Sequence, residues 1–285
     1  MLALGAMWGS SFLFMRIAVP SMGAPALVEG RVLIAAIAIT IAAKIAGQRL
    51  PRGAEWRPCI WIGVFYTAVP LLMWAWAAHT MHASLLSIIN ATAPLFGAVV
   101  AALWFRERLN MLGIAGLVLG FAGVALLVGG EGIDNNVVTN SSVVALAAAF
   151  GAALLYGIMA NYSGAAQRHI TPWTQALGSM WVAVIVTLPV VFIFPFNDTP
   201  PPSAWAAVTA LGLLSTGLAY VMYFRYLARV GATQALAVTY LVPVFGSLWG
   251  VLFLDEPISA HTVAGAAMII GGIAVLARAR SALNK

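Results

Sequence analysis

Long, uninterrupted apolar runs constrain this chain more than any other feature of its sequence. Of the 285 residues, 62% are hydrophobic and only 8% are charged, whereas soluble domains contain roughly 25% charged residues. The mean hydropathy of +0.98 leaves too little polar surface to coat a water-soluble globule. The solvent for most of the chain is therefore expected to be a lipid bilayer.

The apolar runs have the length and pattern of membrane-spanning helices. A spanning helix needs roughly 20 apolar residues, and backbone polar groups in lipid must be satisfied within a helix or a closed barrel. Continuous apolar runs exclude the alternating pattern of a barrel. We therefore predict an all-α integral membrane protein with ten transmembrane helices, near residues 2–19, 25–46, 58–79, 83–105, 110–129, 143–165, 173–195, 204–227, 232–253 and 260–277.

The basic residues are distributed as expected for a membrane topology signal. If the N-terminus is cytoplasmic, 12 of the 14 Lys and Arg residues fall in cytoplasmic segments. The opposite side then receives five acidic residues, Glu131, Asp134, Asp198, Asp255 and Glu256, and no basic loop residue. This is the positive-inside pattern, so the net charge of +6 does not indicate nucleic acid as a partner. We predict a multi-pass protein of a bacterial-type inner (plasma) membrane, with both termini cytoplasmic.

The two halves of the chain resemble each other. An offset of 149 residues aligns 61–128 with the second half without gaps, and it pairs Pro94 with Pro243, and Glu107 with Glu256. Each half holds five predicted helices, an odd number, so the halves must cross the membrane in opposite directions. We predict inverted repeats at 1–129 and 143–285, joined by an outer linker at 130–142. Such repeats are typical of transporters, with the substrate site near the midplane.

Four segments carry a resemblance to a known family: WGSSFLFMRIA (8–18), EGRVLIA (29–35), APLFGAVVAALWFRERL (93–109) and VPVFGSLWGVLFLDEPI (242–258). They resemble the EamA family of the drug/metabolite transporter superfamily, over essentially the whole chain. The resemblance implies ten helices, cytoplasmic termini and a central cavity lined by helices one, three, four, six, eight and nine. The aromatic content is most similar to that of the YddG-type exporters of aromatic and other bulky amino acids.

Polar residues in the fourth and ninth predicted helices are candidates for the cavity wall. Ser87, Asn90 and Pro94 share one helical face with Ala83, and Thr239, Tyr240 and Pro243 lie at the corresponding place in the second half. Such residues can bind a ligand or merely join helices closely. The two prolines remove backbone hydrogen bonds and are predicted to act as hinges.

Aromatic residues on the expected cavity helices are further candidates for substrate binding. Stacking contributes roughly 0.5–1.5 kcal/mol beyond burial, and a cation over a ring roughly 0.5–2 kcal/mol. Each ring can instead serve packing or an interfacial belt. The candidates are Trp8, Phe12, Trp74, Tyr156 and Tyr223, and all of these except Phe12 are preferred. His79, at the end of the third helix, is a candidate hydrogen-bonding or proton-carrying group.

Three charges lie within predicted helices: Arg16, Glu29 and Arg31. A charge at the bilayer centre costs roughly 2.5–3.5 kcal/mol on insertion scales. Glu29 and Arg31 are two residues apart and cannot face each other on a helix, so we expect their partners on other segments. No Glu lies in the middle of the first helix, which argues against the mechanism of the small multidrug antiporters.

The expected function is export of amino acids, aromatic or bulky, or of similar small metabolites, by alternating access. An alternative is a broader drug or nucleoside exporter of the same superfamily. An enzyme is disfavoured because the chain has no acidic cluster for metal-diphosphate chemistry and no recognisable nucleophile motif. A channel is also disfavoured, because it would have continuous polar stripes along its helices, and the polar residues here are scattered. We expect no catalytic residue, metal or cofactor.

Overall fold

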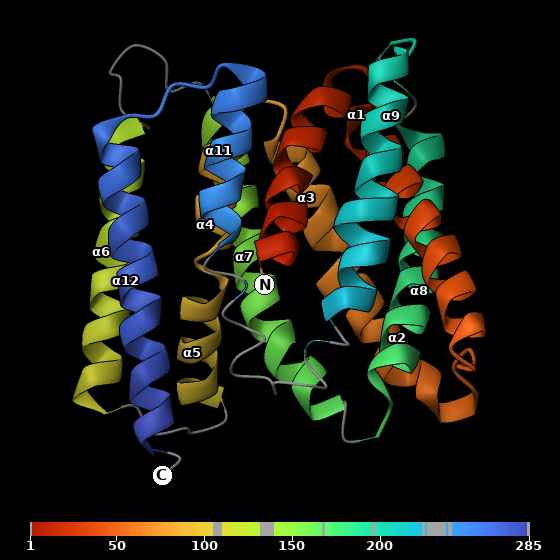
Figure 1. The fold of residues 1–285 in the computed structure, drawn as a ribbon, viewed down its shortest axis with the longest axis horizontal. Helices are drawn as coiled ribbons and strands as arrows, with labels where there is room; N and C mark the ends of the chain where they lie inside the picture. The colour runs from red at the N-terminus through yellow and green to blue at the C-terminus, as the bar shows by residue number, and fades with distance from the viewer. Residues whose placement is uncertain are drawn as a thin grey trace.

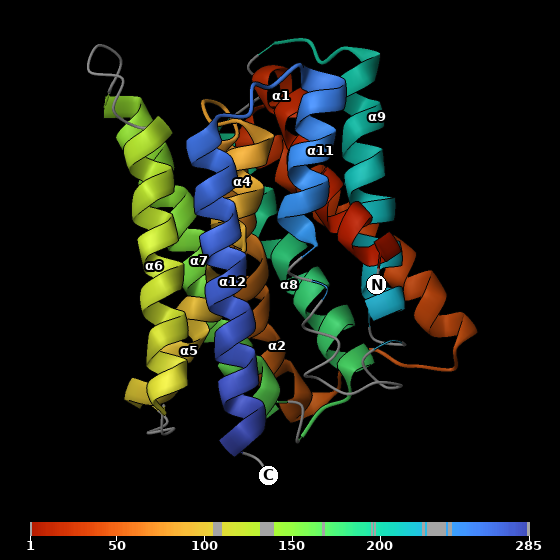
Figure 2. The ribbon, with the colours of Figure 1, turned by 60° about the vertical axis from the view of Figure 1, so that its left-hand side comes forward.

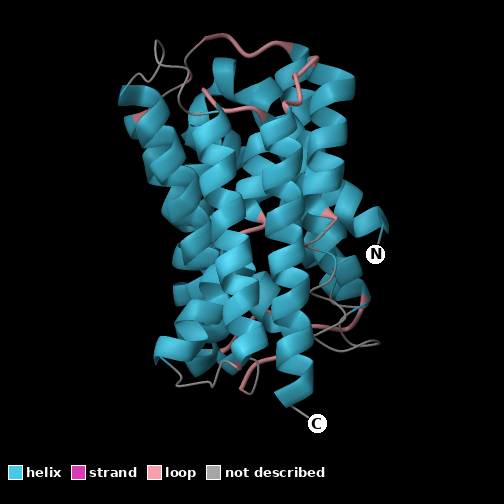
Figure 3. Cartoon of the chain, turned by 90° about the vertical axis from the view of Figure 1, so that its left-hand side faces the viewer, coloured by secondary structure: helices cyan, strands magenta, loops and turns pink. Residues whose placement is uncertain are grey.

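The computed structural model describes residues 2–104, 110–131, 140–166, 169–194, 196, 198–223, 226, 238 and 241–283. Every regular element in these ranges is a helix (Figure 3). The helices stand side by side, with the chain reversing at the two ends of the bundle (Figure 1). The prediction of an all-helical protein is confirmed.

The helical elements follow one another in this order: α1 Leu2–Ile45, η1 Gly53–Glu55, α2 Trp56–Ile62, η2 Gly63–Ala68, α3 Val69–Ala77, α4 Ala83–Asn90, α5 Ala93–Trp104, α6 Met111–Glu131, α7 Asn140–Ala166, α8 Pro172–Ile193, α9 Pro202–Ala210, η3 Leu211–Leu218, α11 Val242–Leu254 and α12 Ala260–Leu283. We call the end of the bundle that holds residues 78–82 and 254–260 the Glu256 end, which is uppermost in Figure 1. The opposite end, which holds residues 46–55, is the Arg49 end.

Element α1 consists of two arms that meet at Gly23. A straight helix of 44 residues would be about 66 Å long, roughly twice the thickness of the hydrocarbon core. Gly23 has a backbone φ of 73°, a conformation that is readily accessible to glycine because it lacks a Cβ. The chain turns back there (Figure 1), which gives the arms 2–22 and 24–45 in place of the separate helices predicted at 2–19 and 25–46.

Three other predicted helices differ in detail from the observed ones. The helix predicted at 83–105 is interrupted at Ala91–Thr92, so α4 and α5 are separate. The helices predicted at 58–79 and 204–227 each contain a π-helical segment, η2 and η3. Because π-helical turns carry an extra residue, they change which side chains face the centre of the bundle, and a 3.6-residue period does not anticipate this.

Seven of the described helical segments are long and apolar enough to cross a membrane. Two more, Met111–Leu126 and Val242–Leu254, are apolar but shorter. The first of the seven is α1, with its turn at Gly23. These lengths and compositions are those of a membrane protein.

Helices α6 and α12 lie side by side at the edge of the bundle (Figures 1 and 2). Their backbones approach closely at four glycines. A Cβ on Gly116 would lie 2.7 Å from the carbonyl oxygen of Gly272, and a Cβ on Gly123 would lie 2.8 Å from that of Gly265. In lipid there is little hydrophobic force between helices, so close contact between small residues holds such a pair together.

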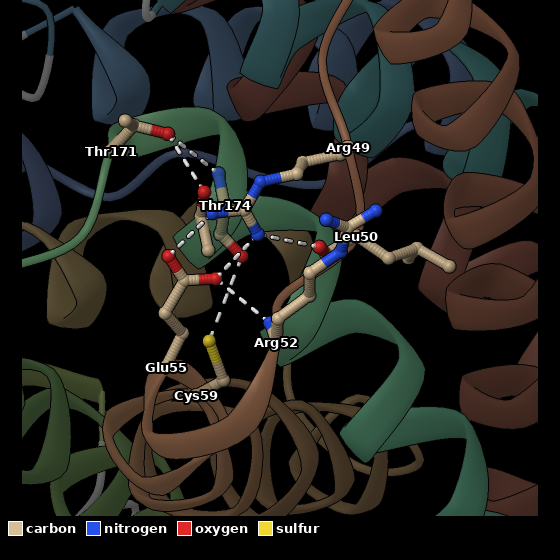
Figure 4. A network of polar contacts seen from close by, with 7 residues as sticks. All are labelled: Arg49, Leu50, Arg52, Glu55, Cys59, Thr171 and Thr174. Atoms are coloured by element: carbon tan, nitrogen blue, oxygen red, sulfur yellow. Dashed lines mark hydrogen bonds and ion pairs between the residues drawn. The ribbon is translucent and has the colours of Figure 1, made fainter.

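A polar turn orders the chain at the Arg49 end (Figure 4). The Arg49 guanidinium donates to both carboxylate oxygens of Glu55, at 2.8 and 3.0 Å. The backbone N–H of Arg52 donates to the same carboxylate at 2.8 Å. This paired geometry holds the start of η1, although the ion pair is exposed and solvent weakens its contribution to stability.

The neighbouring start of α8 is capped by its own side chain. Thr171 accepts a hydrogen bond from the Thr174 backbone N–H at 3.1 Å, and Pro172 occupies the first helical position. The buried Cys59 thiol of α2 donates to the carbonyl of Thr174 at 3.6 Å (Figure 4). The Cys59 contact ties α2 to the capped start of α8.

Candidate functional site

Aromatic side chains from five segments meet inside the bundle. The rings of Trp8 and Tyr223 have centroids 5.3 Å apart, and those of Phe12 and Trp74 are 5.5 Å apart, edge to face. Tyr66 and Tyr156 form a second edge-to-face pair at 5.2 Å. We call the following residues the central aromatic cluster: Trp8, Phe12, Tyr66, Trp74, Tyr156, Tyr220 and Tyr223.

The structure brings the aromatic candidates together. All five of them, Trp8, Phe12, Trp74, Tyr156 and Tyr223, belong to the central aromatic cluster. Trp74 is 2% exposed. Composition alone does not predict that this tryptophan is buried in the cluster. Tyr220 lies within electrostatic range of Tyr156 and Tyr66, which connects the pairs.

Buried polar atoms lie beside these rings. Arg31, in the second arm of α1, donates from Nε to the Thr216 hydroxyl of η3 at 2.9 Å and from an Nη atom to the Ser11 hydroxyl at 3.4 Å. Ser10 and Ser215 share a hydrogen bond of 3.3 Å. These contacts join α1 to η3 in the interior of the molecule.

One polar donor of the cluster is not fully satisfied. The indole N–H of Trp74 is buried and has the Tyr156 phenol near it, but without a hydrogen bond of regular geometry. A buried donor without an acceptor costs about 1–3 kcal/mol. A hydrogen-bond acceptor brought in by a ligand would remove that cost.

The predicted residues of α4 have structural surroundings of their own. The buried Ser87 hydroxyl donates to the Ser84 carbonyl at 2.7 Å, and Ser87 packs directly against Gly246 of α11. Asn90 is half-buried at the last position of α4. These positions place Ser87 in helix packing and leave the Asn90 amide at the break before α5.

Both predicted hinge prolines lie at the start of a helix. Pro94 is the second residue of α5, directly after the Ala91–Thr92 interruption. Pro243 is the second residue of α11. At these positions a proline has no backbone hydrogen bond to remove. Neither proline therefore kinks a continuous helix, and each marks the boundary where one begins.

His79 is separate from the aromatic cluster. It lies exposed in the turn after α3, at the Glu256 end. Desolvation by the surrounding residues and the positive charge of Arg16 lower the pKa of its imidazole, so the ring is neutral at pH 7. The remaining two predicted site residues, Thr239 and Tyr240, lie outside the described residues.

A second polar group, which we call the Glu256 cluster, joins α4 to the segment after α11. The Glu256 side chain is nearly buried, with the residue 5% exposed. Its carboxylate accepts hydrogen bonds from the Ala83 N–H at 2.7 Å, the Ser84 N–H at 3.0 Å and the Ser84 hydroxyl at 2.9 Å. The residue before α4, His82, supplies no side-chain cap, so Glu256 satisfies the first N–H groups of this helix.

Local backbone geometry aims Glu256 at α4. Asp255 ends α11 with a left-handed φ of 51°, a conformation in which aspartate is enriched. The chain then turns back, and the Glu256 N–H donates to the Gly250 carbonyl at 3.2 Å. Any side chain at Gly250 would collide with the Glu256 carboxylate. The left-handed Asp255, the turn after it and the space left by Gly250 together hold the Glu256 carboxylate at the start of α4.

Arg16 completes the Glu256 cluster from α1. Its guanidinium donates to the Ala78 carbonyl at the end of α3, at 3.0 Å. Its Nε atom is 3.9 Å from a Glu256 carboxylate oxygen, longer than a charge-assisted hydrogen bond. The backbone N–H groups of α4 are thus the main partners of Glu256. The cluster connects α1, α3, α4 and α11 at one end of the bundle.

Sequence reasoning missed two of these features. From the sequence, Arg31 is a membrane charge with no assigned role, and Glu256 is an outer acidic residue that pairs with Glu107 in the repeat. An ionisable residue within a membrane span is by itself a signal of function, and this signal could have identified Arg31. The partner of Glu256 could not have been found, because Ala83 and Ser84 have no distinctive sequence pattern.

An open pocket of about 430 Å³ lies elsewhere, at the Arg49 end. It is lined by the start of α2 and the end of α7, including Arg57, Tyr162 and His169. None of the predicted site residues lines it. In the part of the chain that the structure describes, no group of three or more His, Cys, Asp or Glu side chains could hold a metal ion.

Comparison with known proteins gives consistent matches. The sequence profile of the EamA-like transporter family matches residues 1–129 and 143–278. A "probable terminal-alkyne amino-acid exporter" of Streptantibioticus cattleyicolor is 26% identical over 273 residues, which cover 95% of this chain and 90% of that protein. An uncharacterized transporter of Archaeoglobus fulgidus is 22% identical, over 96% of this chain and 95% of that protein. A chloroplastic WAT1-related protein of Arabidopsis thaliana is 25% identical, over 93% and 66%.

A solved crystal structure has a similar fold. It superposes with a TM-score of 0.69, covers 100% of this chain and 98% of that one, and is 21% identical in sequence. The family, the Streptantibioticus cattleyicolor protein and the Archaeoglobus fulgidus protein are named as transporters or exporters and not as enzymes. With its apolar helices of membrane-spanning length, this chain is a multi-pass membrane transporter of small molecules, and it belongs to the EamA-like transporter family.

Proposed function

We propose that this transporter exports amino acids, aromatic or bulky, or similar small metabolites, by alternating access between two inverted five-helix repeats at 1–129 and 143–285. The termini lie on the cytoplasmic face of a bacterial-type inner membrane, and 130–142 forms an outer linker. The substrate occupies the central aromatic cluster, at mid-membrane depth between the repeats.

The observation that carries this proposal is the composition of the central aromatic cluster. Its ring pairs Trp8–Tyr223 and Tyr66–Tyr156 each join residues of the first repeat to residues of the second. A site divided between two mobile units changes shape when the units move, as alternating access requires. Aromatic faces suit aromatic or bulky side chains and also an ammonium group.

The substrate class is supported by one relative. The protein of Streptantibioticus cattleyicolor is named as a probable amino-acid exporter, and the match covers most of both chains. At 26% identity the individual substrate can differ. We therefore extend to this protein only the substrate class, small zwitterionic molecules, and not the individual compound.

The inverted arrangement is supported by reciprocal contacts. Gly116 and Gly265 are 149 positions apart in sequence, as are Gly123 and Gly272. Gly116 contacts Gly272, and Gly123 contacts Gly265. Two equivalent surfaces that exchange partners in this way are related by a twofold axis. The pairing fits a pseudo-twofold axis between α6 and α12.

Other elements recur at the same offset or within one residue of it. The helices after the two breaks begin at Ala93 and Val242, 149 positions apart, and the π-helical segments begin at Gly63 and Leu211, 148 positions apart. The crossing of α1 and α11 at Gly9 and Gly246 is matched by the crossing of α7 and α5 at Gly157 and Gly97.

The aromatic cluster contains residues from equivalent positions of the two halves. Trp8 corresponds to Tyr156 at an offset of 148 residues, and Trp74 corresponds to Tyr223 at an offset of 149 residues.

The Glu256 cluster supplies the contact that one half of the cycle must break. It closes the Glu256 end by joining the second repeat to the start of α4 in the first. When this end opens to the outside, the carboxylate must leave the α4 N-terminus. The boundaries before Pro94 and Pro243 are the places where the helices can tilt.

Topology is tested by cysteine labelling. The chain has one cysteine, Cys59, so Cys59→Ala provides a background for single cysteines at the exposed residues Met111 and Pro257. We expect an impermeant reagent to label Pro257→Cys on intact cells and Met111→Cys only after permeabilisation. Labelling of both from the same side would refute the inverted arrangement.

Transport itself is tested by counterflow in liposomes. Liposomes that contain the purified protein are loaded with unlabelled L-phenylalanine, L-leucine, a nucleoside or a sugar. Uptake of the same compound in labelled form is then measured. We expect exchange of the amino acids alone. Exchange confined to nucleosides would favour the broader exporter, equal leakage of all solutes would favour a channel, and no movement would contradict the proposal.

Replacement of Trp74 should reduce this flux. Trp74→Phe keeps a ring beside Phe12 but removes the indole N–H, and we expect roughly a tenfold loss of exchange if a substrate acceptor uses that donor. Trp76→Ala is the matched control, because Trp76 lies on the same helix and is 60% exposed.

Asn90→Ala is expected to lower flux without lowering membrane expression. Wild-type flux in both Trp74→Phe and Asn90→Ala would assign these residues to packing.

A further inference from the structure

Arg31 is a cation buried at membrane depth. The residue is 7% exposed and lies in the second arm of α1. Removal of a guanidinium from water is costly, and membrane charges therefore pair with other charges or with polar groups of the protein or the ligand. The partners of Arg31 thus decide what this charge does.

Its partners within the protein are neutral. A guanidinium has five N–H donors, and Arg31 uses them on the hydroxyls of Thr216 at 2.9 Å and Ser11 at 3.4 Å. Among the described residues, no carboxylate lies within 4.0 Å of it, and the ion pairs found there involve Arg16 and Arg49. The two hydroxyls carry no charge and engage only two of the five donors. The positive charge and the other donors of Arg31 are therefore unmatched among the described residues.

The acidic residue nearest in sequence does not supply the missing charge. Glu29 is 8% exposed, but its carboxylate accepts a hydrogen bond of 2.5 Å from the Thr187 hydroxyl of α8. It therefore faces α8, whereas Arg31 faces η3, as the two-residue spacing on a helix requires. The two charges are held on different sides of α1.

Arg31 is also in the right surroundings for a ligand. The phenols of Tyr156 and Tyr220 lie within its electrostatic range, and Tyr156 also lies near the buried Trp74 N–H, which has no hydrogen bond of regular geometry. A charged donor, an incompletely satisfied donor and aromatic faces therefore lie in one cluster. This combination matches a carboxylate attached to an apolar or aromatic group.

Helix packing does not explain the guanidinium. A Cβ on Gly212 would lie 3.1 Å from the Arg31 carbonyl oxygen, and a Cβ on Gly63 would lie 2.8 Å from that of Ser179. These are equivalent contacts in the two halves, so Ser179 occupies the position that corresponds to Arg31. A serine is sufficient for the packing at this place, and the charge of Arg31 is an addition to it.

We propose that Arg31 binds the carboxylate of the transported molecule, and that a free carboxylate is the group by which this transporter selects its substrate. The inference rests on the proposed function and narrows its substrate to amino acids and related aromatic or bulky monocarboxylates. Guanidinium and carboxylate can form two parallel hydrogen bonds, and the remaining donors stay on Thr216 and Ser11. Nucleosides and cationic drugs lack this group.

The test compares acids with their amides. Inhibition of labelled L-phenylalanine exchange is measured for L-phenylalanine, L-phenylalaninamide and 3-phenylpropionate in wild type, Arg31→Gln, Arg31→Lys and the exposed control Arg49→Gln. In wild type and Arg49→Gln, we expect the amide to inhibit at least about tenfold less well than the two acids. In Arg31→Gln the acids should weaken to the level of the amide, and Arg31→Lys should recover part of the difference.

Folding is controlled by the thermal unfolding of each detergent-purified variant, and the comparison in wild type needs no variant. Equal inhibition by acid and amide in wild type would overturn the inference while leaving amino-acid export intact. A tenfold preference for acids that persists in Arg31→Gln would assign carboxylate binding to another residue. Exchange of nucleosides without any carboxylate would overturn both proposals.

Discussion

Replacement of Glu256 by alanine is expected to open the Glu256 end of the transporter. The substitution removes all three hydrogen bonds to Ala83 and Ser84 and leaves two N–H groups of α4 without a partner. Hydrogen bonds to charged groups contribute about 1.5–3 kcal/mol each, and 1.4 kcal/mol changes an equilibrium tenfold. The population open at this end should therefore rise at least about tenfold.

Cysteine accessibility measures this shift directly. Ala83 is fully buried in the structure, and a cysteine there, in the Cys59→Ala background, is protected while Glu256 covers the α4 N-terminus. We expect an impermeant thiol reagent to label Ala83→Cys at least about tenfold faster when Glu256→Ala is added. Amino-acid exchange should fall, because the closed state at this end is one step of the cycle.

The adjacent residue provides the control. Asp255 is exposed and adopts the left-handed conformation, which asparagine also tolerates, so Asp255→Asn should leave labelling unchanged. Glu256→Gln tests the role of charge. Its amide has one acceptor oxygen instead of two, and its NH2 group would face a backbone N–H of Ala83 or Ser84, so accelerated labelling is expected here too. Continued protection of Ala83→Cys in Glu256→Ala would show that this contact does not hold the end closed.

Replacement of Gly272 by alanine is expected to destabilise the protein, whereas the same change at Gly271 is expected to be tolerated. A Cβ on Gly272 would lie 2.5 Å from both the Gly116 oxygen and the Gly120 nitrogen, whereas the nearest atom to one on Gly271 is Leu119 Cδ2 at 3.7 Å. Backbone atoms cannot move aside as a flexible side chain can. Overpacking of this kind typically costs about 1–3 kcal/mol.

The measurement is the midpoint of thermal unfolding in detergent, read as loss of monodisperse protein. Gly272→Ala should lower the midpoint by several degrees relative to Gly271→Ala. Gly116→Ala should have a similar effect, because it enters the same contact from α6. The double variant should cost less than the sum of the two, since both changes separate the same pair of helices. Equal midpoints for the Gly271 and Gly272 variants would contradict the close contact.

Several properties of this protein follow from local sequence alone. Runs of about 20 apolar residues predicted a membrane protein made of helices, and paired segments such as APLFG and VPVFG identified the family. Both kinds of signal are local, because the cost of exposing backbone groups to lipid acts on each span separately. The structure brings the candidate aromatic residues Trp8, Phe12, Trp74, Tyr156 and Tyr223 together, and their role in substrate binding stays a prediction.

Other properties depended on how each helix is rotated about its axis. The hinge assignments of Pro94 and Pro243 rested on continuous helices, and the structure instead places both prolines at helix starts. Ser87 and Asn90 share a helical face in the sequence pattern, but Ser87 packs on Gly246 whereas Asn90 ends α4. A helical pattern cannot anticipate a break such as Ala91–Thr92, and it does not say which neighbour a face meets.

The sequence by itself determined the solvent, the helices and the family, because each depends on residues close together in the chain. Only the tertiary structure decided that Glu256 caps α4, 173 residues earlier, and that Arg31 meets two hydroxyls and, among the residues that the structure describes, no carboxylate. Which groups become partners is set by close packing of small residues and by π-helical turns, which fix the rotation and depth of every helix. These interactions act between distant segments, and so they leave no pattern along the chain.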